Sequence, residues 1–261
     1  MKERRSLSSS ERHPSHFGRG GLKLRRMKKL SVDVWSDVVC PWCAVGKRRL
    51  EAALAKFPHR ADVEVVWRAF ELDPTAPRVA VGDNAERIAK KYGRSRAQVE
   101  EMTAQLTRLA AIEGLDFHLD RSRSGNTFDA HRVLHLASER GLQDAVKERF
   151  FRGYMTEGEA IGEPEVLVRL AAEAGLDPEE VRATLATDRY ADDVRDEERA
   201  AREMGISGVP FFVIGGKLGV SGAQPTEVLL RALEQGWASV EAATGASGGS
   251  EAAVCGPEGC G

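Results

Sequence analysis

Two cysteines separated by two residues, Cys40 and Cys43, are the residues whose types and spacing point most directly to chemistry. Residues 30–36 have an apolar-rich strand pattern, and a helical pattern begins directly after the C-x-x-C motif. A strand that delivers a C-x-x-C pair to the first turn of a helix is typical of thiol redox catalysts. We therefore predict dithiol–disulfide chemistry at this pair.

The start of a helix favours a thiolate, because its first four N–H groups lack partners and it carries about half a positive charge. In such a setting the pKa of a cysteine falls from about 8.5 to between roughly 3.5 and 7.5. Cys40 is therefore the predicted attacking sulfur. Cys43, one turn further on the same face, is predicted to resolve the mixed disulfide. Pro41 fits the first helical position, where an N–H would be unpaired.

Half of a zinc site is the alternative interpretation of a C-x-x-C pair, since structural zinc takes about four nitrogen or sulfur ligands. The chain has four cysteines, and the other two, Cys255 and Cys260, lie beyond a Gly- and Ser-rich segment near the end of the chain. We predict redox chemistry rather than a metal at Cys40 and Cys43, and no cofactor.

The composition of the 261 residues, with 42% hydrophobic and 30% charged residues, is that of a soluble globular protein. Residues 1–26 hold eight Lys or Arg and two Glu, so 30 basic and 38 acidic residues remain in the rest of the chain. An acidic body argues against nucleic acid as a partner. No apolar run approaches the length of a bilayer span, so no membrane partner is expected.

Residues 1–26 are rich in Arg, Ser, Gly and His and contain no apolar signal-peptide segment. We predict a disordered basic leader, with Met27 as an alternative translation start. A cytoplasmic location is therefore expected. Disulfides there are transient and catalytic rather than structural, which favours the redox hypothesis.

The order of strand and helix patterns predicts an α/β fold. Residues 62–70 alternate apolar and polar side chains and predict a second strand, parallel to the first across a helical crossover. Strand patterns return at 209–214 and 217–220, with Gly215 and Gly216 as the hairpin turn. Helices are predicted at 84–92, 96–113, from 126 or 127 to 141, 143–156, 164–174, 178–186, 190–204 and 226–235.

This order predicts a thioredoxin-like domain with a helical insertion subdomain between its βαβ and ββα halves. The predicted parts are the leader (1–26), the βαβ half (28–75), the helical insertion (83–204), the ββα half (205–240) and a flexible tail with a C-x4-C pair (241–261).

Five motifs lie in order over about 200 residues: 36–43 (SDVVCPWC), 70–74 (FELDP), 126–132 (NTFDAHR), 205–212 (GISGVPFF) and 220–225 (VSGAQP). Together they resemble the DsbA-like thioredoxin superfamily, specifically its FrnE-type cytoplasmic dithiol–disulfide oxidoreductases. The pairing of C-P-W-C with G-V-P-F-F is the specific part of this resemblance. It implies an enzyme that acts on protein disulfides or dithiols, with isomerase activity where attack and release alternate.

In that family the proline of the second motif is cis and faces the active cysteine, which here implies Pro210 opposite Cys40. A cis Pro210 would offer the backbone of Val209 to an extended substrate by β-augmentation. Trp42, between the two cysteines, completes the predicted substrate-binding residues. The alternative is an ordinary trans proline at a strand edge.

Four polar residues are further candidates. Asp37 and Glu71 follow the first two predicted strands and could accept a proton from Cys43 through water; the alternative is a pair of exposed strand-end charges. Asn126 and His131 begin an insertion helix that could face the cleft. Their alternative roles are a helix cap and a packed histidine.

Cys255 and Cys260 are predicted as an auxiliary redox pair, since glycine and proline between them favour a turn that brings two sulfurs together. Ten Gly- or Ser-like residues span roughly 17 Å, enough for the pair to reach Cys40 within one chain or across a homodimer. A metal clip and inert exposed thiols are the alternatives.

Glutathione-dependent isomerisation is the second functional hypothesis. Kappa-class glutathione transferases and related isomerases are similar to this chain in having a helical insertion, but they typically carry a serine in place of Cys40. A third hypothesis is a chaperone-like or metal-buffering binding module that uses all four thiols. For an oxidoreductase, glutathione and a thioredoxin-type protein are the candidate reductants.

Overall fold

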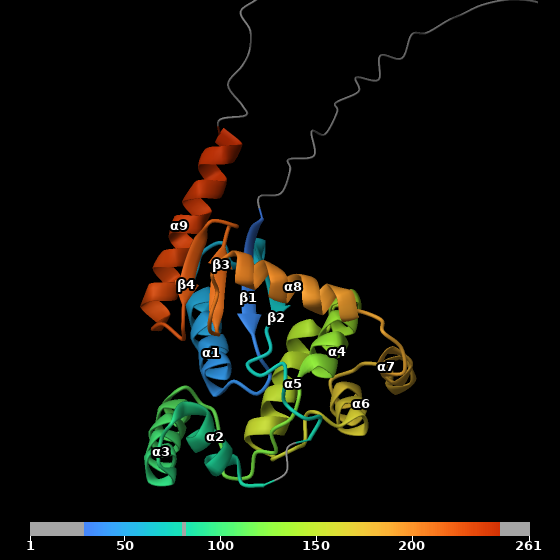
Figure 1. The fold of residues 1–261 in the computed structure, drawn as a ribbon. Coiled ribbons are helices and arrows are strands. Elements are labelled where there is room, and N and C mark those ends of the chain that lie inside the picture. The colour runs from blue at the N-terminus through green and yellow to red at the C-terminus, as the bar shows by residue number, and fades with distance from the viewer. Residues whose placement is uncertain (1–28, 80–81, 246–261) are drawn as a thin grey trace, which may run out of the picture.

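A four-stranded sheet lies at the centre of the computed structural model, which describes residues 29–79 and 82–245 (Figure 1). The strands are β1 (Leu30–Ser36), β2 (Val63–Ala69), β3 (Phe211–Ile214) and β4 (Leu218–Ser221). Their order in the sheet is β2-β1-β3-β4, with β1 parallel to β2 and the other two pairs antiparallel.

Nine α-helices are present in the part of the chain that is described. They are α1 (Pro41–Lys56), α2 (Asn84–Tyr92), α3 (Arg96–Ile112), α4 (Phe128–Glu139), α5 (Gln143–Met155), α6 (Pro164–Glu173), α7 (Pro178–Leu185), α8 (Ala191–Glu203) and α9 (Thr226–Gly245). The mixed α/β architecture, thioredoxin-like with a helical insertion, confirms the predicted fold class.

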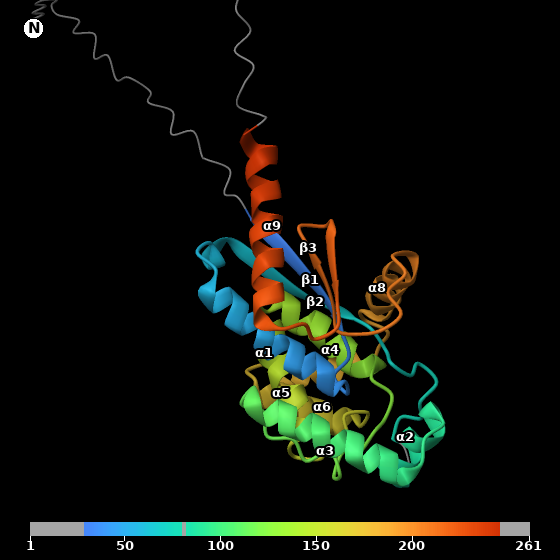
Figure 2. The same ribbon diagram turned by 90° about the vertical axis from the view of Figure 1, so that its left-hand side faces the viewer.

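Helices cover both faces of the sheet. α1 and α9 lie on one face and α8 lies on the other (Figure 2). Leu30, Val32 and Val34 of β1 pack into the core with α1 and α9, whereas Trp35 packs against α8 and donates its indole N–H to the Glu197 carbonyl at 3.0 Å. β1 therefore places apolar side chains on both of its faces, with Leu30, Val32 and Val34 on one and Trp35 on the other.

The predicted helix boundaries are confirmed to within two residues for α2 to α8. The last helix is an exception, because α9 continues past the predicted end at Gln235 to Gly245. The predicted flexible tail is therefore wrong for residues 241–245. Trp237 explains the extension, since its ring is buried beside Phe57 and stacks on His59 at a centroid distance of 4.3 Å. This packing stabilises helical backbone beyond the predicted end.

The helical insertion divides into parts with different neighbours. α4 to α7 pack on one another beyond the end of β1 from which α1 starts, and α2 and α3 form a hairpin to one side (Figure 1). α8 lies on the sheet instead, where the Glu197 carboxylate accepts the N–H of Ala69 at 2.7 Å. The core of α4 to α7 extends without a break to Cys40 and Cys43, so the insertion packs directly against the C-x-x-C pair.

No helix within residues 29–79 and 82–245 combines the length and apolar character needed to cross a membrane.

Gly236 of α9 lies close to the sheet and provides a test of this packing. A Cβ at this position would lie 2.6 Å from Cγ2 of Ile214 and 3.2 Å from Cδ1 of Leu30. Overpacking costs about 1–3 kcal/mol, and the helix preference of alanine offsets up to about 1 kcal/mol. We expect Gly236→Ala to lower the free energy of unfolding by about 1–2 kcal/mol in urea denaturation.

The matched control is Gly208→Ala, because a Cβ at Gly208 would meet no atom within 4 Å. Its free energy of unfolding should stay within about 0.5 kcal/mol of the starting protein. Equal stabilities for the two variants would contradict the close packing of α9 on β1 and β3.

Candidate active site

Cys40 is the N-cap of α1, directly after the turn that follows β1. Its backbone is extended, Pro41 occupies the first turn, and the N–H of Cys43 donates to the Cys40 carbonyl at 3.0 Å. This places the sulfur of Cys40 at the positive end of the helix, where the helix dipole favours negative charge. The ring of Trp42 is exposed next to it.

The two cysteines differ in accessibility. Both are free thiols, and Cys40 is 4% exposed whereas Cys43 is fully buried in the core that α4 to α7 form. Burial, together with the adjacent Cys40 thiol, raises the pKa of Cys43 well above its ordinary value. Cys43 is therefore a protonated thiol at neutral pH, and of the two cysteines only Cys40 retains any exposure.

The second motif meets the first at Val209 and Pro210. The peptide bond between them is cis, as the family resemblance implies. The Cys40 thiol donates to the Val209 carbonyl at a sulfur-to-oxygen distance of 3.6 Å, across 169 residues of sequence. α1 approaches Pro210 closely, since a Cβ on Gly46 would lie 2.9 Å from Cγ of the proline. The structure thus brings together the predicted nucleophile and the predicted substrate-binding backbone.

Asp37 lies behind the cysteines and is completely buried rather than exposed at a strand end. One carboxylate oxygen accepts the Leu72 N–H at 2.8 Å, and the other lies 3.5 Å from Nε2 of buried His131. Burial favours the neutral acid, but His131, the Leu72 N–H and Lys147 outweigh it and lower the pKa of Asp37. Asp37 therefore remains a carboxylate, which is a weak proton acceptor.

Glu71 and Asn126 belong to a separate network. Nδ2 of Asn126 donates to Glu71 at 3.0 Å, while its Oδ1 accepts the Phe128 N–H at 2.9 Å and so helps to start α4. Arg195 donates to the other oxygen of Glu71 at 2.6 Å. Burial, with the nearby charge of Glu198, still raises the pKa of Glu71. Within the described residues, no hydrogen bond joins Glu71 to either cysteine.

Lys147 is the residue of this site that sequence analysis did not identify. It lies on α5, is fully buried, and its Nζ donates to the Ser36 carbonyl at 3.3 Å. Nζ lies 5.7 Å from the centroid of the Trp67 ring and 5.3 Å from that of Phe151. No carboxylate among the described residues lies within ion-pair distance of it. Burial lowers the pKa of Lys147 to about 8, against the opposing effect of Cys43, Asp37 and Cys40.

A sequence signal for Lys147 existed. Helix α5 buries an apolar stripe that includes Val146, Phe150 and Tyr154, and Lys147 lies in that stripe one turn before Phe151. A lysine on the apolar face of an amphipathic helix is uncommon unless it is paired. Its partners could not be read from the sequence, because Ser36 and Trp67 belong to distant strands.

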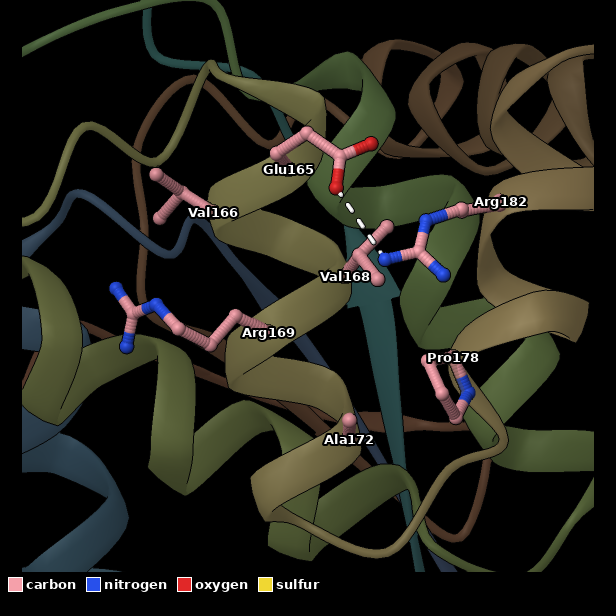
Figure 3. A pocket seen from close by; sticks show the side chains of 7 residues that line it. All are labelled: Glu165, Val166, Val168, Arg169, Ala172, Pro178 and Arg182. Atoms are coloured by element: carbon pink, nitrogen blue, oxygen red, sulfur yellow. Dashed lines mark hydrogen bonds and ion pairs between the residues drawn. The ribbon is translucent and has the colours of Figure 1, made fainter.

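A pocket of about 500 Å³ lies between α6 and α7 (Figure 3). Its lining residues are Glu165, Val166, Val168, Arg169, Ala172, Pro178 and Arg182. Glu165 and Arg182 form an ion pair of 3.4 Å across it. None of the predicted site residues lines this pocket.

Metal-site geometry is not found in the described part of the chain, where no three His, Cys, Asp or Glu side chains are grouped to hold an ion. The predicted auxiliary pair, Cys255 and Cys260, lies outside the described residues and stays a prediction.

Two sequence comparisons find relatives of this chain. A family model described as a DSBA-like thioredoxin domain matches residues 31–234. The uncharacterized protein YwbO of Bacillus subtilis is 31% identical over 205 residues, which cover 77% of this chain and 94% of that protein.

Solved structures agree in fold. A probable DsbA oxidoreductase from Streptomyces coelicolor has 45% sequence identity and a TM-score of 0.76, over 89% of this chain and 96% of that one. The cytosolic disulfide reductase DsbM from Pseudomonas aeruginosa, solved with GSH, has 19% identity and a TM-score of 0.53, over 82% and 98%. At that identity the likeness to DsbM is one of fold alone.

The buried Lys147 predicts a pH dependence of stability. Its pKa is about 8 in the folded chain and ordinarily 10.5, so the unfolded state binds more protons between these values and stability should rise with pH there. The difference corresponds to about 3 kcal/mol. We expect Lys147→Met to raise the free energy of unfolding at pH 7 by up to about 3 kcal/mol and to remove the rise, in urea titrations of the reduced protein.

Lys47→Met is the matched control, since Lys47 is also buried but lies within 4 Å of Glu51, Asp144 and Glu148. These carboxylates outweigh burial and raise the pKa of Lys47, so its removal should destabilise the protein at pH 7. A loss of stability at pH 7 in both variants would contradict an unpaired Lys147.

Proposed function

The chain belongs to the DsbA-like thioredoxin family, and from this premise we propose that it is a thiol–disulfide oxidoreductase of the FrnE type that acts on protein substrates. The observation that carries the proposal is the contact between the Cys40 thiol and the Val209 carbonyl, at the positive end of α1 and beside cis Pro210.

The reaction proceeds in two thiol–disulfide exchange steps. The Cys40 thiolate attacks a substrate disulfide, a bond forms between Cys40 and one substrate sulfur, and the other substrate sulfur leaves and takes up a proton. The Cys43 sulfur then attacks Cys40, which frees the first substrate sulfur as a thiol. The substrate gains two electrons, and the chain is left with a Cys40–Cys43 disulfide.

The same steps in reverse donate a disulfide to a substrate dithiol. Isomerase activity arises when a substrate thiol, rather than Cys43, attacks the mixed disulfide and a new substrate pairing forms. The unequal accessibility of the cysteines supports this division of roles, since a bulky substrate can approach Cys40 but not the fully buried Cys43.

The substrate is an extended polypeptide segment that lies beside Val209. Backbone groups next to the cysteine would pair with the segment as an added strand, while the exposed ring of Trp42 contacts its apolar side chains. This arrangement favours protein disulfides over small-molecule disulfides, because a polypeptide can form backbone hydrogen bonds beside the reacting sulfur.

Glutathione and a thioredoxin-type protein are the proposed reductants, and the cytoplasm is the proposed location. The likeness in fold to DsbM, which is described as a cytosolic disulfide reductase and was solved with GSH, is compatible with both. In a reducing compartment the Cys40–Cys43 disulfide would form only transiently, as turnover requires.

Two single variants test the roles of the cysteines. Cys40→Ser removes the attacking sulfur, so the rate of insulin reduction should fall to the uncatalysed background. Cys43→Ser removes the resolving sulfur, so a Cys40–substrate mixed disulfide should accumulate to near one equivalent. Non-reducing electrophoresis follows the reduction of insulin with Cys40→Ser. Mass spectrometry identifies the adduct that Cys43→Ser accumulates.

The outcome also separates the alternative functions. A glutathione-dependent isomerase would keep its activity in Cys43→Ser and show saturable dependence on glutathione. A binding module would show no turnover in any variant and no adduct at Cys40. Either result would replace the proposed function.

A further inference from the structure

We propose that Lys147, supplied by the helical insertion, stabilises the Cys43 thiolate in the step that releases the substrate. This inference rests on the proposed function and assigns the charge that its second step requires. Lys147 does not touch the substrate, and it acts through Cys43.

The second step presents a physical difficulty. Cys43 must become a nucleophilic thiolate at a position that is fully buried among apolar side chains. Water cannot solvate a charge there, and burial disfavours the thiolate. A positive charge inside the same core would remove most of this penalty.

The groups around the pair leave one candidate for that charge. Asp37, in the loop between β1 and α1, and Glu197 on α8 are acidic and would oppose a thiolate. His131 on α4 is engaged with Asp37 at 3.5 Å. Among described residues, the electrostatic partners of Lys147 are Cys43, Asp37, Cys40 and Glu197. Cys43 comes first among these partners and Cys40 is a weaker one, so Lys147 is the aliphatic amine whose charge acts mainly on Cys43.

The position of the Lys147 amine is well defined. Its Nζ donates to the carbonyl of Ser36 at 3.3 Å. The backbone carbonyl of the next residue, Asp37, accepts the N–H of Cys40 at 3.2 Å. The Lys147 amine is therefore bound to the turn that leads into the cysteines. The rings of Trp67 and Phe151 hold it on two sides. The Ser36 carbonyl accepts from only one of the three N–H donors of the ammonium group. The charge of the ammonium group is therefore not neutralised and can act on a thiolate.

A comparison with Lys47 supports a special role. Lys47 is also buried, though less completely, and is neutralised by three carboxylates of α1 and α5, an arrangement that stabilises the packing of these helices. Lys147 has no such partner among the described residues. An unpaired buried lysine destabilises the fold, and a compensating role beside Cys43 accounts for its presence.

The release of the substrate is a second thiol–disulfide exchange. The Cys43 thiol loses its proton and its sulfur attacks the sulfur of Cys40 in the mixed disulfide. The bond between Cys40 and the substrate breaks, and the departing substrate sulfur takes up one proton, which balances the proton that Cys43 lost. Two electrons have then passed to the substrate over both steps, and Lys147 begins and ends the step with the same charge.

A peptide disulfide with a different fluorophore on each half separates the two steps. The attack of Cys40 releases one half, and the attack of Cys43 releases the other, so stopped-flow fluorescence records two phases. We expect Lys147→Met to leave the first phase within about twofold and to slow the second roughly 10- to 100-fold at pH 7. The second phase should recover at higher pH. Lys47→Met, the control, should leave the second phase unchanged.

Lys147→Arg provides a second test that does not depend on a neutral variant. Arginine keeps its charge at every accessible pH, whereas Lys147 loses its charge above about pH 8. The second phase should therefore keep rising with pH in Lys147→Arg, while the rise in the starting protein flattens above pH 8. A merely structural lysine would not change the shape of this profile.

An unchanged second phase in Lys147→Met, or the same pH profile in Lys147→Arg and the starting protein, would overturn the inference. Failure of the proposed function is distinguishable from this, because the starting protein would then show no first phase at all.

Discussion

Burial of the C-x-x-C pair in one of the two cores is the constraint on which the rest of the structure depends. One core joins the sheet to α1 and α9, and the other belongs to α4 to α7 and includes Cys40 and Cys43. This position leaves one sulfur near the surface and encloses the other. The chemical difference between two identical side chains is therefore a difference in solvent access, set by the packing of the insertion against the first turn of α1.

Charge is arranged around this constraint in two ways. Lys47, Glu71 and Asp37 have opposite charges or hydrogen-bond donors close by, as buried ionic groups usually do. Lys147 instead contacts a single carbonyl and two aromatic rings. A site with one unpaired cation and two thiols can stabilise negative charge on sulfur. In a fully paired site, carboxylates would already neutralise the cation.

Sheet topology supplies the remaining part of the site. β3 runs antiparallel to β1, and its register pairs Trp35 with Phe211 at the end of β1 that precedes the cysteines. The segment before β3 therefore passes beside Cys40, and this explains how Val209 reaches its thiol. α8 covers the face of the sheet opposite α1 and α9, so the inserted segment contributes to the thioredoxin-like layer as well as to the separate bundle.

The sequence by itself determined the short-range features of this protein. Strand alternation, capping residues and glycine stops predicted β1, β2 and the helices from α2 to α8, because these signals act within a few residues of each other. The motif C-P-W-C at a strand-to-helix junction likewise indicated the chemistry, since the position of Cys40 at the helix start depends only on its neighbours.

Only the tertiary structure decided the features that depend on distant partners. Helix α9 continues past Gln235 because Trp237 packs near Phe57, and Asp37 is buried because the Leu72 backbone and His131 enclose it. Lys147 joined the site because α5 packs across the end of β1, which no pattern around residue 147 reveals. Burial and electrostatic environment are properties of side chains brought together by folding, so the sequence pointed to the two cysteines as candidates and the tertiary structure determined their surroundings.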